Sequence, residues 1–124
     1  MFRYKKIEGI DILNSKIPSE LQSWHKFFKI LELKYSMNSI DEYYCDYTNI
    51  MTLLVSDRQE QYKIELSLYN ISGDFNFNMA NGLGSGFAID EFSDSGIEKI
   101  FHLYSFEQDM KYDLYGEKIR VVLL

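Results

Sequence analysis

The sequence holds one cysteine, one proline and two histidines in 124 residues. A single cysteine excludes an intrachain disulfide and a metal cage built from thiolates alone. No apolar run approaches the roughly 18 residues that a membrane-spanning helix needs, and no basic and apolar signal segment opens the sequence. We therefore expect a protein of the cytoplasm that contacts no membrane.

Motifs for metal and nucleotide binding are also scarce. There is no H-E-x-x-H pattern, no EF-hand loop and no pair of clustered histidines, so we expect no metal and no cofactor. Gly82, Gly84 and Gly86 lack the spacing of a dinucleotide-binding loop, and no Lys-Ser or Lys-Thr pair follows them. We expect this segment to be a flexible hairpin loop.

The charge is acidic and unevenly distributed. The net charge is −6, made up of +3 over residues 1–34 and −9 over residues 35–124. An acidic surface repels phosphate backbones, which argues against a nucleic-acid partner. It can attract a basic protein and speed the encounter. The plainer alternative is that the charge only keeps the protein soluble.

The clearest strand is Gln61–Ile71. Here Tyr62, Ile64, Leu66 and Leu68 alternate with polar or half-polar residues. A period of two places the first set on one face of a strand. We expect this strand near the middle of a sheet.

Similar segments recur at spacings of about ten residues with turn signals between them, a pattern typical of antiparallel sheets. They predict strands at 29–37, 50–55, 74–79, 87–92, 99–106, 111–115 and 117–124, and a short broken strand within 2–13. The fold class expected is α+β in a single domain, 1–124. It would be a mainly antiparallel curved β-sheet of seven to nine strands, meander or sandwich-like, with one short N-terminal helix.

The helix is expected to begin at Ser19. Gln22 three residues later completes a capping-box pattern. Leu21, Trp24 and Phe28 then fall on one helical face. We expect Trp24 to be the anchor of this helix in the core.

Few residues suggest catalysis. His25 and His102 could form an acid–base pair of the kind that ribonucleases use, but the acidic surface weighs against an RNA substrate. The ordinary alternative is two partly buried structural histidines. Cys45 lies in an acidic stretch that disfavours its thiolate, so we do not expect a nucleophile there.

Two acidic groups are candidates for a protein interface. Tyrosine offers a large, rigid contact area with a polar tip, and carboxylates can mimic phosphates toward a basic partner. A solvated loop with buried tyrosines is the alternative. The candidate residues are Asp41, Glu42, Tyr43, Tyr44, Asp46, Tyr47, Asp90, Glu91 and Asp94.

From Ile64 onward, the order of features resembles that of immunity proteins from polymorphic toxin systems. The residues that carry the resemblance are Asn70-Ile71, Phe75/Phe77, Gly86-Phe87/Ile89/Asp90, Ser95-Gly96, Tyr104, Glu107/Asp109 and Ile119/Val121. The resemblance covers about half of the chain. This chain has Gly116 near the place where many of these proteins carry a cysteine.

The resemblance implies an antitoxin that binds and neutralises the C-terminal toxin domain of a cognate effector, as in contact-dependent growth inhibition. The partner would be a basic toxin domain, commonly a nuclease, blocked at or near its active site. The protein would not be an enzyme. Two alternatives stay open: a general protein-interaction or scaffold domain, and a small enzyme that uses His25 and His102.

Overall fold

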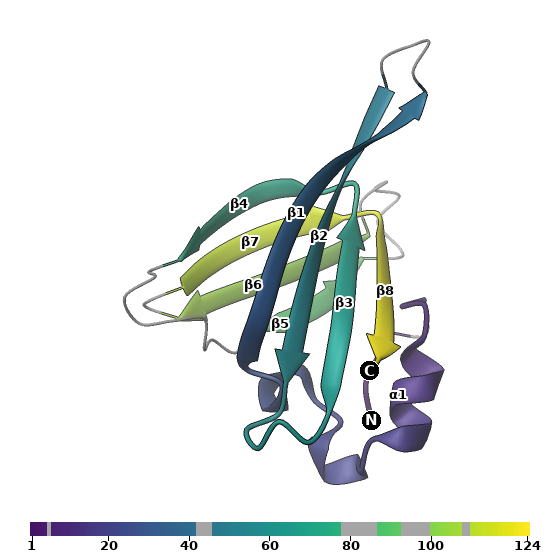
Figure 1. Cartoon of the computed structure of the whole chain (residues 1–124), viewed down its shortest axis with the longest axis vertical. Helices are drawn as coiled ribbons and strands as arrows, with labels where there is room; N and C mark the ends of the chain where they lie inside the picture. The colour runs from purple at the N-terminus through teal and green to yellow at the C-terminus, as the bar shows by residue number, and fades with distance from the viewer. Residues whose placement is uncertain (5, 42–45, 78–86, 93–99, 108–109) are drawn as a thin grey trace.

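The computed structural model describes residues 1–4, 6–41, 46–77, 87–92, 100–107 and 110–124, without the side chains of residues 39–41, 46–47, 77, 106–107 and 110–111. Within these residues, eight strands form two four-stranded antiparallel sheets, and a short α-helix lies near the N-terminus (Figure 1). The α+β, mainly antiparallel fold class is therefore confirmed. No helix in the described part is long and apolar enough to cross a membrane.

The first sheet has the strand order β1-β2-β3-β8. Its strands are β1 (Lys29–Asp41), β2 (Asp46–Ser56), β3 (Lys63–Tyr69) and β8 (Lys118–Leu123). The alternation in β3 predicted its place correctly, because β3 lies between two neighbours and buries Ile64, Leu66 and Leu68. β1 and β2 continue past the ends of the other strands as a two-stranded arm (Figure 1).

The second sheet has the order β4-β7-β6-β5, and its strands cross behind those of the first sheet (Figure 1). Its strands are β4 (Ser72–Phe77), β5 (Ala88–Glu91), β6 (Phe101–Glu107) and β7 (Met110–Gly116). Ile89, Leu103 and Leu114 lie side by side across three strands and are buried. They belong to one hydrophobic core with the inward residues of β3.

The chain passes between the sheets at two corners that lie side by side. At the first corner, between β3 and β4, Asn70 takes a left-handed conformation with φ 53°. At the second, between β7 and β8, the Glu117 N–H donates to the Tyr69 carbonyl at 2.9 Å, and the Asn70 amide donates to the Glu117 carboxylate at 2.9 Å. A Cβ on Gly116 would run into the Leu68 side chain. The close packing of Leu68 therefore favours glycine at the second corner.

The predicted position of the helix is wrong. The α-helix, α1, spans Ile10–Lys16, where a short strand was expected. Ile10, Leu13 and Ile17 fall at helical spacing and are all buried. β-branched residues are common in strands as well as tolerated in helices, so Ile10 and Ile12 made the segment resemble a strand.

The predicted capping box does not form. Pro18 stands at the cap position, and the Gln22 N–H donates to the Ser19 backbone carbonyl at 3.3 Å. The Gln22 amide instead donates to the carbonyls of Asn14 and Ile17, at 3.0 and 2.7 Å. These carbonyls lie at the C-terminal end of α1, where helix carbonyls lack partners within the helix. Gln22 therefore caps the C-terminal end of α1 with its side chain.

Residues 19–26 form two 3-10 turns, η1 (Ser19–Leu21) and η2 (Trp24–Lys26). The expected burial of Trp24 is confirmed, because it is 8% exposed and its ring centroid lies 4.6 Å from that of Phe2, but it lies in a 3-10 turn and not on the expected helix. The deeply buried neighbour is Phe27, not Phe28, since the chain leaves helical periodicity at η2.

Candidate functional site

The outward face of the second sheet carries a cluster of carboxylates and aromatic rings. Side chains alternate along a strand, so the strands that bury Ile89, Leu103 and Leu114 turn the residues between them outward. Cross-strand pairing then aligns them in two neighbouring rows. We call this set the acidic-aromatic face; it consists of Asp74, Asp90, Phe92, His102, Tyr104, Asp113 and Tyr115.

His102 lies at the centre of this face, within a group of aromatic rings. Its ring centroid is 4.4 Å from that of Tyr115, with the planes 1° apart. Tyr104 lies 4.5 Å away and Phe92 6.0 Å away, both with their planes at 26° to the imidazole. The His102 side chain is only 14% exposed. The imidazole therefore fills the middle of an aromatic shelf.

Two carboxylates lie beside this shelf on neighbouring strands. The Asp113 carboxylate hydrogen-bonds the Nε2 atom of His102, and this contact becomes an ion pair when the imidazole is protonated. Asp74 is the direct cross-strand partner of Asp113 and makes no ion pair with any described residue. Like charges directly opposite each other destabilise a sheet. The pair therefore holds negative charge at an energetic cost to the free protein.

The third carboxylate, Asp90, is tied to Tyr104. This tyrosine has a pKa above its ordinary value of 10.0, first because its hydroxyl donates a hydrogen bond to Asp90. Desolvation and the negative charge of Asp90 disfavour the tyrosinate further. The hydrogen bond joins β5 to β6 across the outward face and orients both side chains.

The chemistry of this face is that of a binding surface for cations. The described part of the chain holds no group of three or more His, Cys, Asp or Glu residues that could ligate a metal. Aromatic rings attract guanidinium and ammonium groups, and carboxylates form charge-assisted hydrogen bonds with them.

The first acidic group predicted from the sequence lies at the end of the β1–β2 arm. Asp41 and Asp46 are cross-strand partners there, and Tyr47 follows in β2. Glu42, Tyr43 and Tyr44 fall outside the described residues, as does Cys45. The end of the arm is far from β5 (Figure 1). The fold therefore keeps the two predicted acidic groups apart.

The second group is divided between the two sides of a strand. Asp90 lies on the acidic-aromatic face, whereas Glu91 is opposite Phe101 on the inward side and is half-buried. The Oε1 atom of Glu91 is buried and has no hydrogen-bond partner among the described residues. Asp94 lies outside the described residues, and so does the glycine segment 82–86. Of the two described residues of this group, Asp90 lies on the outward face and Glu91 on the inward side.

The two histidines are held by different parts of the fold. His25 is exposed on η2 and lines a pocket with residues 87–90, while His102 lies on the outward face of β6. His102 is engaged with Asp113, whereas the His25 ring makes no hydrogen bond or ring contact with any described residue. The acid–base pair stays a prediction, and the arrangement adds nothing in its favour.

Five residues of the acidic-aromatic face were missed as binding candidates. They are Asp74, Phe92, Tyr104, Asp113 and Tyr115. The spacing of two between His102 and Tyr104, and between Asp113 and Tyr115, signals that each pair shares a strand face. Which strands are neighbours depends on long-range pairing, so the sequence alone does not join the two pairs.

No protein-family model matches this chain, no curated protein matches it in sequence, and no solved structure matches its fold.

Proposed function

We propose that this protein is an immunity protein that binds a basic toxin domain through the acidic-aromatic face and thereby neutralises it in the cytoplasm of its host. The class of partner comes from the resemblance of the C-terminal half to immunity proteins. The binding surface comes from one observation, the placement of Asp74 directly opposite Asp113 beside the aromatic shelf.

The energetic argument begins with this carboxylate pair. In the free protein the two negative charges repel each other across neighbouring strands. A lysine or arginine of the partner placed between them removes the repulsion and gains charge-assisted hydrogen bonds. Binding energy is therefore concentrated on a feature that is unfavourable when the protein is alone. Such a feature favours a cationic partner over a neutral one.

The aromatic residues supply the rest of the interface. The rings of Tyr104 and Tyr115 are held against His102. Rigid tyrosine rings lose little conformational entropy on binding and are frequent at the energetic centre of interfaces. A nuclease toxin carries basic groups where it holds phosphates, so an acidic surface that covers them blocks its substrate as well.

A co-expression rescue tests the proposal. The C-terminal domain encoded immediately upstream of this protein's gene is induced in cells with and without the protein. Relief of growth arrest by this protein is the expected result. Arrest that persists, or an upstream domain without toxicity, contradicts the proposal and favours a general interaction or scaffold domain.

The binding surface is tested by a pair of charge-matched variants. Asp74→Asn with Asp113→Asn removes two charges from the acidic-aromatic face, and Asp11→Asn with Glu65→Gln removes two from exposed positions elsewhere. The first variant should bind the toxin domain more slowly, most clearly at low salt, because steering by charge is screened at high ionic strength. Equal association rates for the two variants would place the interface elsewhere.

A further inference from the structure

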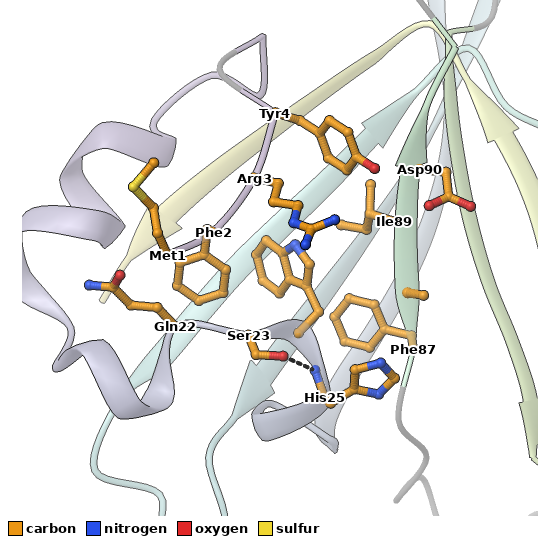
Figure 2. A pocket seen from close by; sticks show the side chains of 12 residues that line it. Met1, Phe2, Arg3, Tyr4, Gln22, Ser23, His25, Phe87, Ile89 and Asp90 are labelled. Atoms are coloured by element: carbon orange, nitrogen blue, oxygen red, sulfur yellow. Dashed lines mark hydrogen bonds between the residues drawn. The ribbon is translucent and has the colours of Figure 1, made fainter.

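A pocket of about 430 Å³ lies beside β5 and is bordered by Asp90 of the acidic-aromatic face. Its walls come from residues 1–4, residues 22–25 around the start of η2, and residues 87–90 of the β5 segment (Figure 2). Sites for small molecules commonly have volumes of roughly 300–1,000 Å³. The pocket is therefore large enough for a ligand of one ring and a short side group.

One wall of the pocket is aromatic. Trp24 lies between Phe2 and Phe87, with ring centroids 4.6 Å and 5.5 Å from its own. Phe2 and Phe87 are 3% and 1% exposed, so both rings are held firmly by the core. Flat aromatic surfaces pack favourably against a further ring in stacked or edge-on geometry. This wall suits a planar, apolar group.

Arg3 and Trp24 bring N–H donors to the pocket. Figure 2 shows the Arg3 guanidinium pointing toward the middle of the pocket, between Phe2 and Ile89. Arg3 makes no ion pair with any described residue. The indole Nε1 of Trp24 is buried and has no hydrogen-bond partner in the described part of the chain, although Trp24 is only 8% exposed. Buried donors are normally satisfied, so the Trp24 N–H favours an acceptor, whereas the exposed Arg3 guanidinium is open to an anion.

Arg3 is the basic residue that lines the pocket, and Asp90 is the acidic one. Asp90 belongs to the same segment, but its carboxylate points to the other side of β5 from Phe87 and Ile89 (Figure 2). There it accepts a hydrogen bond from Tyr104. Arg3 is thus the charged group that faces the pocket interior, and a guanidinium binds a carboxylate with two parallel hydrogen bonds.

We propose that this pocket binds a small aromatic monocarboxylate, with its carboxylate on Arg3 and the Trp24 indole N–H and its ring against the aromatic wall. Asp90 borders both this pocket and the acidic-aromatic face, but the proposal does not depend on the proposed toxin partner. A carboxylic acid with one aromatic ring complements this lining, because its carboxylate can accept hydrogen bonds and its ring can pack against the aromatic wall.

The test uses the fluorescence of Trp24, which is the only tryptophan of the chain. Phenylacetate is titrated into the intact protein, and phenylacetamide, which has the same shape without the charge, is the matched ligand. A saturable change in Trp24 emission is expected with phenylacetate. Phenylacetamide should bind at least roughly tenfold more weakly, because it loses a charge-assisted hydrogen bond. Equal binding of the two ligands, or only linear quenching, would overturn the proposal.

A substitution of Arg3 tests whether this residue binds the carboxylate of the ligand. Arg3→Met should weaken phenylacetate binding by about tenfold or more. Arg58→Met, in the exposed turn after β2, removes the same charge elsewhere and should leave binding unchanged. Because both arginines are exposed, neither substitution disturbs the core, and thermal unfolding verifies this. Unchanged affinity in Arg3→Met, or equal losses in the two variants, contradicts the assignment.

Discussion

The imidazole of His102 lies flat against the ring of Tyr115, with centroids 4.4 Å apart and planes 1° apart. The two residues are cross-strand partners on β6 and β7. Asp113, two residues before Tyr115, hydrogen-bonds the same imidazole. One strand therefore holds the histidine by its face and by its edge. His102 joins β6 to β7 on a surface that is otherwise open to solvent.

Replacing His102 should destabilise the protein. His102→Ala removes stacking contacts with three rings, worth about 0.5–1.5 kcal/mol for an aromatic pair, and leaves Asp113 without its partner. We expect the free energy of unfolding to fall by about 1–3 kcal/mol, measured by urea denaturation. His25→Ala is the matched control and should change little, because His25 is exposed on η2. Equal effects of the two substitutions would contradict the central role of His102.

Trp24 should contribute more to stability than any exposed aromatic residue. Trp24→Ala opens a cavity among Phe2, Phe27 and Phe87, so the free energy of unfolding should fall by roughly 3–5 kcal/mol. Circular dichroism must follow the transition, because the fluorescent residue itself is removed. Trp24→Phe keeps most of the apolar contact and should lose clearly less. A thermal melt that Trp24→Ala leaves unchanged would be incompatible with the burial of this side chain.

The corner at Gly116 should reject a side chain. Gly116→Ala places a methyl group against the buried Leu68 side chain, and overpacking of this kind costs about 1–3 kcal/mol. Leu68→Ala alone leaves a cavity, which the new methyl group partly fills. The double variant should therefore lose less stability than the two single losses together. Strict additivity in chemical denaturation would refute this packing.

Gly9 offers the contrasting case. It has φ +90°, and a Cβ there would meet the backbone carbonyl of Val121. The clash is with a backbone atom, which Val121→Ala does not remove. Adding Val121→Ala to Gly9→Ala should therefore restore none of the lost free energy of unfolding.

The hydrogen bond between Tyr104 and Asp90 should make stability depend on alkaline pH. The folded-state pKa of Tyr104 is raised above 10.0 by this bond. Its contribution is thus fully present below pH 10 and is lost as the pH rises through the raised pKa. An NMR titration with ¹³C-labelled tyrosine should show Tyr104 ionising later in the wild type than in Asp90→Asn. Identical titration curves in the two proteins would show that this hydrogen bond does not raise the pKa of Tyr104.

The strands were predictable because alternation is a local property. A period of two along β3 needs only neighbours in sequence, and it correctly predicted a buried face and an interior position in the sheet. The burial of Trp24 was expected from a helical face; the burial holds, although the helix does not form there. Composition and alternation together therefore determined the fold class.

The helix position could not be predicted, because two segments competed for it. The Ser19–Gln22 pattern has the sequence of a capping box, but Gln22 is used by the carbonyls of Asn14 and Ile17. Only the packed structure offers those acceptors. Ile10 and Leu13 become helical because β8 lies where their apolar side chains can be buried.

The candidate sites depend on contacts between residues far apart in the sequence. The amino-acid sequence by itself determined which residues alternate outward along each strand, because that follows from backbone geometry. Only the tertiary structure decided that Asp74 lies opposite Asp113, and that Arg3 and Trp24 line one pocket beside Phe87. Strand order and register are set by burial of the whole core, and a short sequence pattern carries no record of them.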